Sequence, residues 1–386
     1  MAAGANGKIF KSAKNNDQRF PFKNLRSLDI SHISKIIKKE EERMKKNLKA
    51  NIIMVLCFTF IFFSFSGSGL ADVLDNVKSR GIVNCGVPPG FPGFSSVNNK
   101  GVRVGFDIDH CRAIAAGVLG DPTKIKLTPV GLRDGFPSLR AGSLDVLTHR
   151  FTWTLRRDAG AVDWVRVMTY DGQGFIVRKD SGVKKLADLD GATICTSQGS
   201  TMEINTTDYF RKNNLKLELI TYKSVPEAFS AYIAKRCDSM TAGALGLVAN
   251  SQKLADPENH IILPERISME PIGPLVAQGQ SRWGDAVRWI LNALIAAEEL
   301  GVTQANVDEQ RKSSNNPQIK RLLGVTGDLG KTLGLSNDWA YNVIKAVGNY
   351  GEIFDRHVGL NTRLKLDRGL NALWNKGGLL ISPPIR

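Results

Sequence analysis

The sequence lacks the residue patterns that most catalytic and cofactor sites require. Its five histidines are scattered, and no two of them have the spacing of a metal-ligand pair, so we expect no metal site. There is no Gly-x-Ser-x-Gly nucleophile elbow and no glycine-rich dinucleotide fingerprint after a strand. Residues 330–332 resemble the end of a phosphate-binding P-loop, but the motif's first glycine would fall at Val325. The sequence therefore predicts no catalytic residues and no cofactor.

Cysteine and aromatic residues are also few, but the composition as a whole is that of an ordinary globular protein. Five of the 386 residues are cysteine and 8% are aromatic, whereas 42% are hydrophobic and 23% are charged. Such a composition excludes disorder, collagen and a coiled coil as descriptions of the whole chain. Because domains usually have roughly 100 to 200 residues, the length favours two domains.

The chain has a net charge of +15, which alone would suggest a nucleic acid or an anionic membrane as partner. The excess is uneven, however. Residues 1–71 contain 13 basic and 5 acidic side chains, so this short segment has a net charge of +8 and the other 315 residues only +7. We therefore expect no nucleic-acid partner.

The basic segment resembles an export leader. Lys45, Lys46 and Lys49 precede a nearly unbroken apolar run at residues 52–65, and small residues at 69 and 71 follow it. This arrangement predicts a signal peptide at residues 44–71, cleaved after Ala71. A retained membrane anchor is the alternative, but a bilayer span needs about 20 apolar residues. Residues 1–43 are interpreted as a disordered or loosely helical extension, or as a product of a misplaced start codon.

The remaining chain alternates between strand-like and helix-like patterns, which is typical of parallel α/β sheets. One series of alternating elements ends near residue 172, and a second follows up to residue 271. We therefore predict lobe 1 at residues 72–172, lobe 2 at residues 173–271, and a return to lobe 1 with a helical extension at residues 272–386. The two crossings between the lobes, near residues 170–174 and 270–274, are expected to form a hinge. The expected helices include one with a Ser200 to Glu203 capping box, one capped by Asn337 and Asp338, and a last one over residues 363–376.

Four cysteines lie outside the leader, and three pairings of them are possible. In an exported chain an even number of cysteines favours disulfides. The pairs Cys85–Cys111 and Cys195–Cys237 are favoured because each would stay within one lobe. The alternative is four reduced, buried cysteines that act as small apolar residues.

Three segments carry a family resemblance. They are Gly-Phe-Asp-Ile-Asp at residues 105–109, the stretch from Leu147 to Asp158, and Ser-Gln-Gly-Ser-Thr at residues 197–201. In this order they resemble the periplasmic solute-binding proteins that serve ABC importers of polar amino acids, and in particular the general L-amino-acid-binding branch. Further similar stretches extend the resemblance from about residue 72 to the C-terminus. It implies a two-lobed α/β periplasmic binding protein of type II with a cleft between the lobes.

The resemblance also implies a binding site. Arg157 would hold a substrate carboxylate with help from the Thr152 hydroxyl, which is chemically reasonable because a guanidinium can bind a carboxylate with two hydrogen bonds. Ser200 and Thr201, at the start of a helix in the other lobe, would face the same anion. Phe91 and Leu132 would enclose the bound amino acid. Without the resemblance, Arg157 could equally be a solvated surface charge and both apolar residues would be assigned to the core.

One position departs from the family pattern. The family usually has an acid that pairs with the ligand's ammonium where this chain has Gly243. The loss of such a desolvated charge partner costs roughly 2–5 kcal/mol of binding free energy. We expect Gly243→Asp to restore that pairing, unless a nearby acid such as Glu203 or Asp238 has taken it over. Arg150 and Phe151 are also larger than the family's short polar residues, and Pro88 replaces a common polar one.

These observations predict a monomeric periplasmic protein that delivers an L-amino acid, or a related carboxylate, to an inner-membrane ABC permease and its ATPase. An enzyme on the same fold is the first alternative, and Glu203 would be its only candidate acid or base. A secreted ligand-responsive protein that has lost transport is the second.

Overall fold

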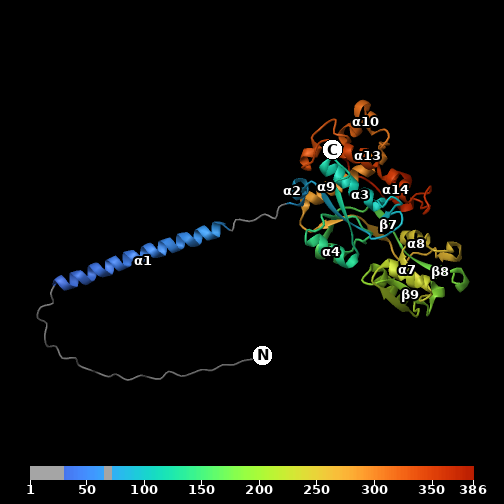
Figure 1. Ribbon diagram of the computed structural model, residues 1–386, viewed down its shortest axis with the longest axis horizontal. Coiled ribbons are helices and arrows are strands. Elements are labelled where there is room, and N and C mark those ends of the chain that lie inside the picture. Colours follow the sequence, from blue (N-terminus) through green and yellow to red (C-terminus); the bar gives the residue numbers. More distant parts are fainter. Residues whose placement is uncertain (1–29, 65–71) are drawn as a thin grey trace, which may run out of the picture. The chain divides into compact units, whose positions relative to one another are not determined.

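The structure, a computed structural model, describes residues 30–64 and 72–386 (Figure 1). The chain forms two compact units, residues 1–69 and 70–386. In the first unit the described part is one helix, α1 (Ile30–Ser64). In the second, two α/β lobes are joined by a pair of crossing strands.

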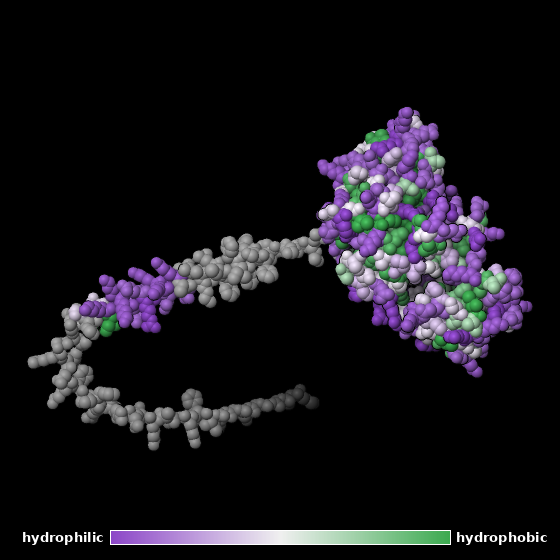
Figure 2. Space-filling view, viewed as in Figure 1, coloured by the Kyte–Doolittle hydropathy of each residue, from purple (hydrophilic) through white to green (hydrophobic). Residues whose placement is uncertain are grey.

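Helix α1 is continuous through Met44, so residues 30–43 are helical together with the start of the expected signal peptide. Figure 2 shows that the described side chains of its first half are mostly hydrophilic, and those at residues 33–49 are exposed. The expected cleavage site at Ala71 lies outside the described residues, as do residues 1–29. Among the helices described, none has the length and apolarity needed to cross a bilayer.

Lobe 1 contains a five-stranded sheet in the order β4-β1-β5-β14-β6. Strands β1, β4 and β5 run parallel, and β14 inserts antiparallel between β5 and β6 after the chain returns from lobe 2. The elements of this lobe before the first crossing are α2 (Val73–Arg80), β1 (Val83–Val87), β2 (Ser96–Val97), β3 (Arg103–Val104), α3 (Phe106–Leu119), β4 (Ile125–Pro129), α4 (Leu132–Arg140), β5 (Val146–Leu147), α5 (Leu155–Ala161) and β6 (Val162–Trp164).

Lobe 2 repeats this plan with a sheet in the order β10-β9-β11-β8-β12. Strands β9, β10 and β11 are parallel, and β8 and β12 are antiparallel to their neighbours. The helices and strands are β8 (Gln173–Arg178), β9 (Thr193–Ser197), α6 (Thr201–Lys212), β10 (Glu218–Tyr222), α7 (Val225–Ile233), β11 (Ser239–Gly243), α8 (Ala244–Ser251) and β12 (His260–Ile262), with 3-10 turns η1 (Lys179–Ser181), η2 (Leu186–Leu189) and η3 (Pro257–Asn259).

The two segments that connect the lobes pair with each other. Strand β7 (Thr169–Asp171) leaves lobe 1 and strand β13 (Glu270–Ile272) returns to it, and the two form an antiparallel ladder of their own. A two-stranded ladder fixes the backbone where the chain changes lobe. The side chains at its ends can therefore reach both lobes.

The C-terminal helices complete the core of lobe 1. Figure 1 shows α13 and α9 beside α3, and buried residues of these helices form one continuous apolar cluster with β1. The elements are β14 (Leu275–Ala277), α9 (Ser281–Glu299), α10 (Val307–Ser313), α11 (Pro317–Leu322), α12 (Leu329–Thr332), α13 (Trp339–Val347), α14 (Tyr350–His357), η4 (Gly369–Asn371) and η5 (Trp374–Lys376).

One expectation for this region was wrong and another holds only in part. Residues 363–376 form two separate 3-10 turns rather than one helix, and Lys365 has a positive φ of 47°, which breaks helical geometry. Asp338 is the N-cap residue of α13, as expected, but its side chain accepts no hydrogen bond from the start of the helix. It binds Arg311 instead, at 2.5 Å.

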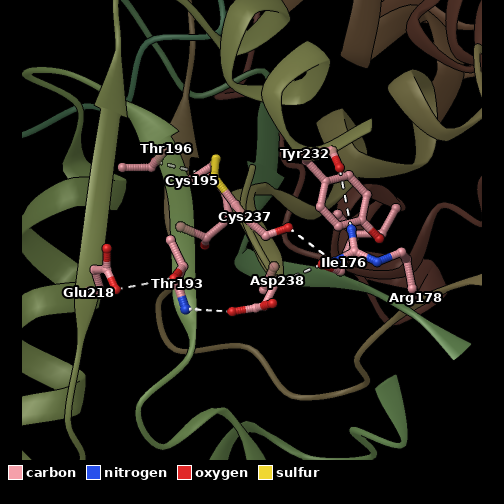
Figure 3. The surroundings of a disulfide bond; sticks show 11 residues. Ile176, Arg178, Thr193, Cys195, Thr196, Glu218, Tyr232, Cys237 and Asp238 are labelled. Carbon is pink, nitrogen blue, oxygen red and sulfur yellow. Dashed lines mark hydrogen bonds between the residues drawn. A yellow bond between two sulfur atoms is a disulfide. The ribbon is translucent and has the colours of Figure 1, made fainter. Parts of the chain in front are cut away.

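Both favoured disulfides are present and each stays within its lobe. Cys85 on β1 is bonded to Cys111 on α3, and Cys195 on β9 is bonded to Cys237. Figure 3 shows that the second bond ties β9 to the start of β11, next to Asp238, whose carboxylate accepts a hydrogen bond from the Thr193 N–H at 2.9 Å. Neither bond restrains the movement of one lobe against the other.

Candidate ligand-binding pocket

A pocket lies between the lobes and the crossing strands, and its empty space, which includes open solvent at the mouth, is about 1080 Å³. It contains all seven residues that the sequence suggested for ligand binding: Phe91, Leu132, Thr152, Arg157, Ser200, Thr201 and Gly243. It is also lined by residues that the sequence did not indicate, among them Asp171, Lys223 and Glu270.

Arg157 is held in place by its own helix. Thr154 caps α5 by accepting a hydrogen bond from the Arg157 N–H at 3.4 Å, and Arg157 Nη1 donates to the Thr152 carbonyl at 2.9 Å. Its guanidinium lies 5.9 Å from the centre of the Phe136 ring. Burial lowers the pKa of Arg157, and the nearby Glu270 opposes that shift, but an arginine remains charged at physiological pH. A partly desolvated, fixed guanidinium is suited to binding a carboxylate.

Hydroxyl groups from both lobes meet beside this arginine. Thr152 Oγ1 lies 3.3 Å from Thr201 Oγ1, which donates to Glu270 Oε2 at 3.1 Å. Glu270 Oε1 also accepts hydrogen bonds from Asn205 at 2.9 Å and Ser268 at 2.7 Å. Glu270 therefore positions Thr201 opposite lobe 1. Glu270 could not be recognised from the sequence, because an isolated glutamate before a Pro-Ile-Gly-Pro stretch has no distinguishing pattern.

Helix α6 begins at the pocket with Ser200 as its N-cap. The Ser200 hydroxyl accepts from the Glu203 N–H at 3.4 Å, as expected, but Glu203 Oε2 accepts from Gly199 rather than closing a capping box on Ser200. The positive φ of Gly199, 70°, permits this turn. The first N–H groups of a 12-residue helix favour an anion at this end.

The two expected apolar residues both contact the opposite lobe. A Cβ at Gly246 would lie 2.9 Å from the Phe91 ring, and one at Gly199 would lie 3.9 Å from Leu132. Arg133 adds a hydrogen bond to Gln198 across the mouth at 2.9 Å. Phe91 and Leu132 thus lie where the lobes approach each other.

The end of the pocket near Gly243 differs most from expectation. A Cβ at position 243 would lie only 2.5 Å from Asp171 Oδ2, so Asp171 occupies the space beside the missing side chain. Asp171 is paired with Arg150 at 3.2 Å, and the exposed fractions of these two side chains are 4% and 7%. Arg150 also lies 4.1 Å from the centre of the Phe94 ring. This end therefore holds an internal ion pair.

The two acids suggested as replacements for position 243 are not at this end. Asp238 lies at the opposite end of β11, near Thr193 (Figure 3), and Glu203 is engaged with Gly199. Neither lines the pocket. Neither acid has therefore replaced the missing side chain at position 243. The acid beside Gly243 is Asp171, which strand β7 brings there from a distant part of the sequence.

Buried ionisable groups surround Arg150. Burial raises the pKa of Asp107 to about 7, although the Arg150 charge opposes this. Burial lowers the pKa of His149 to about 3, and its ring stacks on Phe151 at 3.8 Å. Among the described residues no group of three or more histidine, cysteine or acidic side chains could hold a metal ion.

Two α/β lobes, a crossing ladder and a pocket between them define a periplasmic binding protein. The chain belongs to the bacterial extracellular solute-binding proteins, family 3, whose pattern matches residues 83–306. Similarity continues well beyond that range, over most of each relative described next.

Two relatives and one solved structure cover most of the chain. It is 51% identical to the general L-amino acid-binding periplasmic protein AapJ of Rhizobium johnstonii over 82% of this chain and 93% of the relative. It is 47% identical to the glutamate/glutamine/aspartate/asparagine-binding protein BztA of Rhodobacter capsulatus, over 83% and 95%. A periplasmic binding protein from Brucella ovis with glutathione bound is 48% identical, with a TM-score of 0.79 over 82% of this chain and all of that one. The protein is thus a periplasmic solute-binding protein.

Proposed function

We propose that the protein captures an L-amino acid, or a related compound with an amino-acid carboxylate, and delivers it to an ABC permease and its ATPase in the inner membrane. The observation that carries the proposal is the fixed Arg157 guanidinium, which lies in the same pocket as Thr152 and Thr201. The relatives support it, since AapJ and BztA are named for amino-acid binding and the Brucella ovis protein holds glutathione, a peptide with two carboxylates.

In this proposal the ligand's carboxylate binds Arg157 from lobe 1 and the start of α6 from lobe 2. Each contact joins the ligand to a different lobe, so the bound ligand favours the closed arrangement. Glu203, which the sequence suggested as the acid or base of an enzyme on this fold, does not line the pocket.

Binding calorimetry of the purified protein tests the proposal. The panel contains the twenty L-amino acids, glutathione, and the corresponding amides that lack the free carboxylate. We expect at least one carboxylate compound to bind in the micromolar range or tighter and its amide to bind at least 30-fold more weakly, because the amide cannot accept charge-assisted bonds from Arg157. Equal binding of acid and amide would contradict the proposal.

A further inference from the structure

The Arg150–Asp171 ion pair determines what the nitrogen end of the pocket can recognise. Asp171 Oδ1 accepts two backbone hydrogen bonds, from Gly172 N at 2.8 Å and Leu245 N at 3.2 Å. Asp171 Oδ2 accepts one, from Arg150 Nη2 at 3.2 Å. A carboxylate has about four acceptor positions. One position therefore remains, and it is on Oδ2.

The free acceptor position borders the ligand space. Asp171 and Gly243 both line the pocket, and Oδ2 is the atom closest to where a Cβ of residue 243 would be. Because Gly243 has no side chain, a ligand atom can approach Oδ2 from that side. A nitrogen of a ligand whose carboxylate is on Arg157 has a hydrogen-bond acceptor there.

The negative charge at this acceptor is largely neutralised by Arg150. Arg150 is almost as buried as Asp171, so its positive charge is hardly screened by water and cancels the carboxylate's field at short range. Within the part of the chain that the structure describes, Arg150 Nη1 is buried without a hydrogen-bond partner, so no second acid forms a hydrogen bond with the guanidinium through this nitrogen. A ligand ammonium would lose its hydration and meet a neighbouring cation, both of which are unfavourable. A neutral N–H group forms the same single hydrogen bond without either cost.

We propose that the pocket recognises the ligand's α-nitrogen as a neutral N–H donor, so that N-acylated amino acids, including the C-terminal residue of short peptides, belong to its substrate class. This inference rests on the proposed function, since Arg157 must hold the carboxylate. The pocket can hold an acyl group, because small and apolar residues that carry no charge line it as well: Pro88, Pro89, Gly90, Pro226 and Gly246.

The test compares each amino acid with its N-acetyl form, and with a dipeptide that ends in it, by calorimetry on the purified protein. The proposal predicts that acylation weakens binding less than tenfold, or strengthens it. Weakening of tenfold or more would overturn it while leaving the proposed function intact. If no carboxylate compound binds, or if Arg157→Ala leaves the affinity for a bound one unchanged, both proposals fail.

Variants of Arg150 test whether its positive charge causes the preference for a neutral N–H donor. Arg150→Gln removes the neutralising charge from Asp171, and we expect the preference for the free amino acid over its acetyl form to rise at least tenfold. Arg150→Lys keeps the charge and should keep the ratio of the wild type. The matched control is Arg156→Gln, which removes an exposed cation that does not line the pocket, and should change the ratio less than threefold. Equal ratios in Arg150→Gln and wild type would overturn the proposal.

If Arg150→Gln does not fold, Asp171→Asn tests whether Asp171 Oδ2 accepts the hydrogen bond from the ligand's nitrogen. Its amide oxygen can still accept from Gly172 and Leu245, but its nitrogen replaces the free acceptor at Oδ2. Both the free and the acetylated ligand should then bind about fivefold to tenfold more weakly. Unchanged affinity for the acetylated ligand would overturn the role of Oδ2.

Discussion

Asp171 and Glu270 are direct register partners in the β7–β13 ladder, yet the side chains that their carboxylates bind lie in different lobes. Asp171 pairs with Arg150 of lobe 1, whereas Glu270 binds Thr201 and Asn205 of lobe 2. The strand pair that joins the lobes therefore also fixes the side chains at both ends of the pocket. A ligand that contacts these groups acts directly on the segments about which the lobes would move.

Arg157→Ala should cause the largest loss of ligand affinity of any single substitution in the pocket. Hydrogen bonds to charged groups contribute about 1.5–3 kcal/mol each, so the loss of two corresponds to at least about 100-fold. Arg156→Ala is the matched control, because Arg156 is exposed on the same helix and does not line the pocket. Calorimetry of both folded variants decides the matter, and equal affinities for the best ligand would refute the carboxylate role.

Gly243→Ala should destabilise the protein and disturb the Arg150–Asp171 pair. The new Cβ would lie 2.5 Å from Asp171 Oδ2, and such overpacking typically costs about 1–3 kcal/mol. Gly90→Ala is the control, since Gly90 lines the same pocket but has open space where its Cβ would be. Thermal unfolding should show a lower midpoint for Gly243→Ala alone. The same contact argues against the expectation that Gly243→Asp restores an ammonium site, because the new carboxylate would meet the existing one.

Removal of the Cys195–Cys237 bond should destabilise lobe 2 and leave ligand recognition unchanged. The bond closes a loop of 42 residues, for which the chain-entropy relation gives about 4 kcal/mol. Neither cysteine lines the pocket. A Cys195→Ala/Cys237→Ala variant should therefore unfold at lower urea concentration yet bind the ligand with wild-type affinity at low temperature. Unaltered urea resistance would show that the bond contributes nothing to stability.

The family, the two lobes and the pocket residues around Arg157 could be predicted from the sequence because each depends on local patterns. Arg157 follows a Thr-Trp-Thr stretch that starts a helix, and Ser200 begins another. Asp171 and Glu270 could not be found this way, since they are 99 positions apart and meet only through the β7–β13 ladder. The same limit applies to Asp338. Its N-cap position can be read from the local sequence, but the partner of its side chain, Arg311, lies 27 positions away on another helix.

Asp107 should make stability depend on pH between about 4 and 7. Burial raises the pKa of its carboxyl from 3.8 to about 7 in the folded protein, so the folded state keeps a proton that the unfolded state has already lost. This proton stabilises the fold fully below pH 3.8, and the stabilisation is lost as pH rises through 7. His110 and His149 act in the opposite direction, because burial lowers the pKa of each to about 3. The net profile of the wild type therefore does not isolate Asp107.

The difference between wild type and Asp107→Asn does isolate it, since the two histidines are present in both proteins. An asparagine cannot ionise, so we expect the variant to gain stability relative to wild type as pH rises from 4 to 7, and the difference to stay constant above about 8. Urea unfolding at four or more pH values measures this directly. A difference that is flat across the range would mean that Asp107 ionises in the folded protein as it does in water, in which case the nearby Arg150 charge outweighs burial. The pair beside Gly243 would then share its guanidinium with a second carboxylate, and the Arg150→Gln variant would leave two buried acids unpaired instead of one.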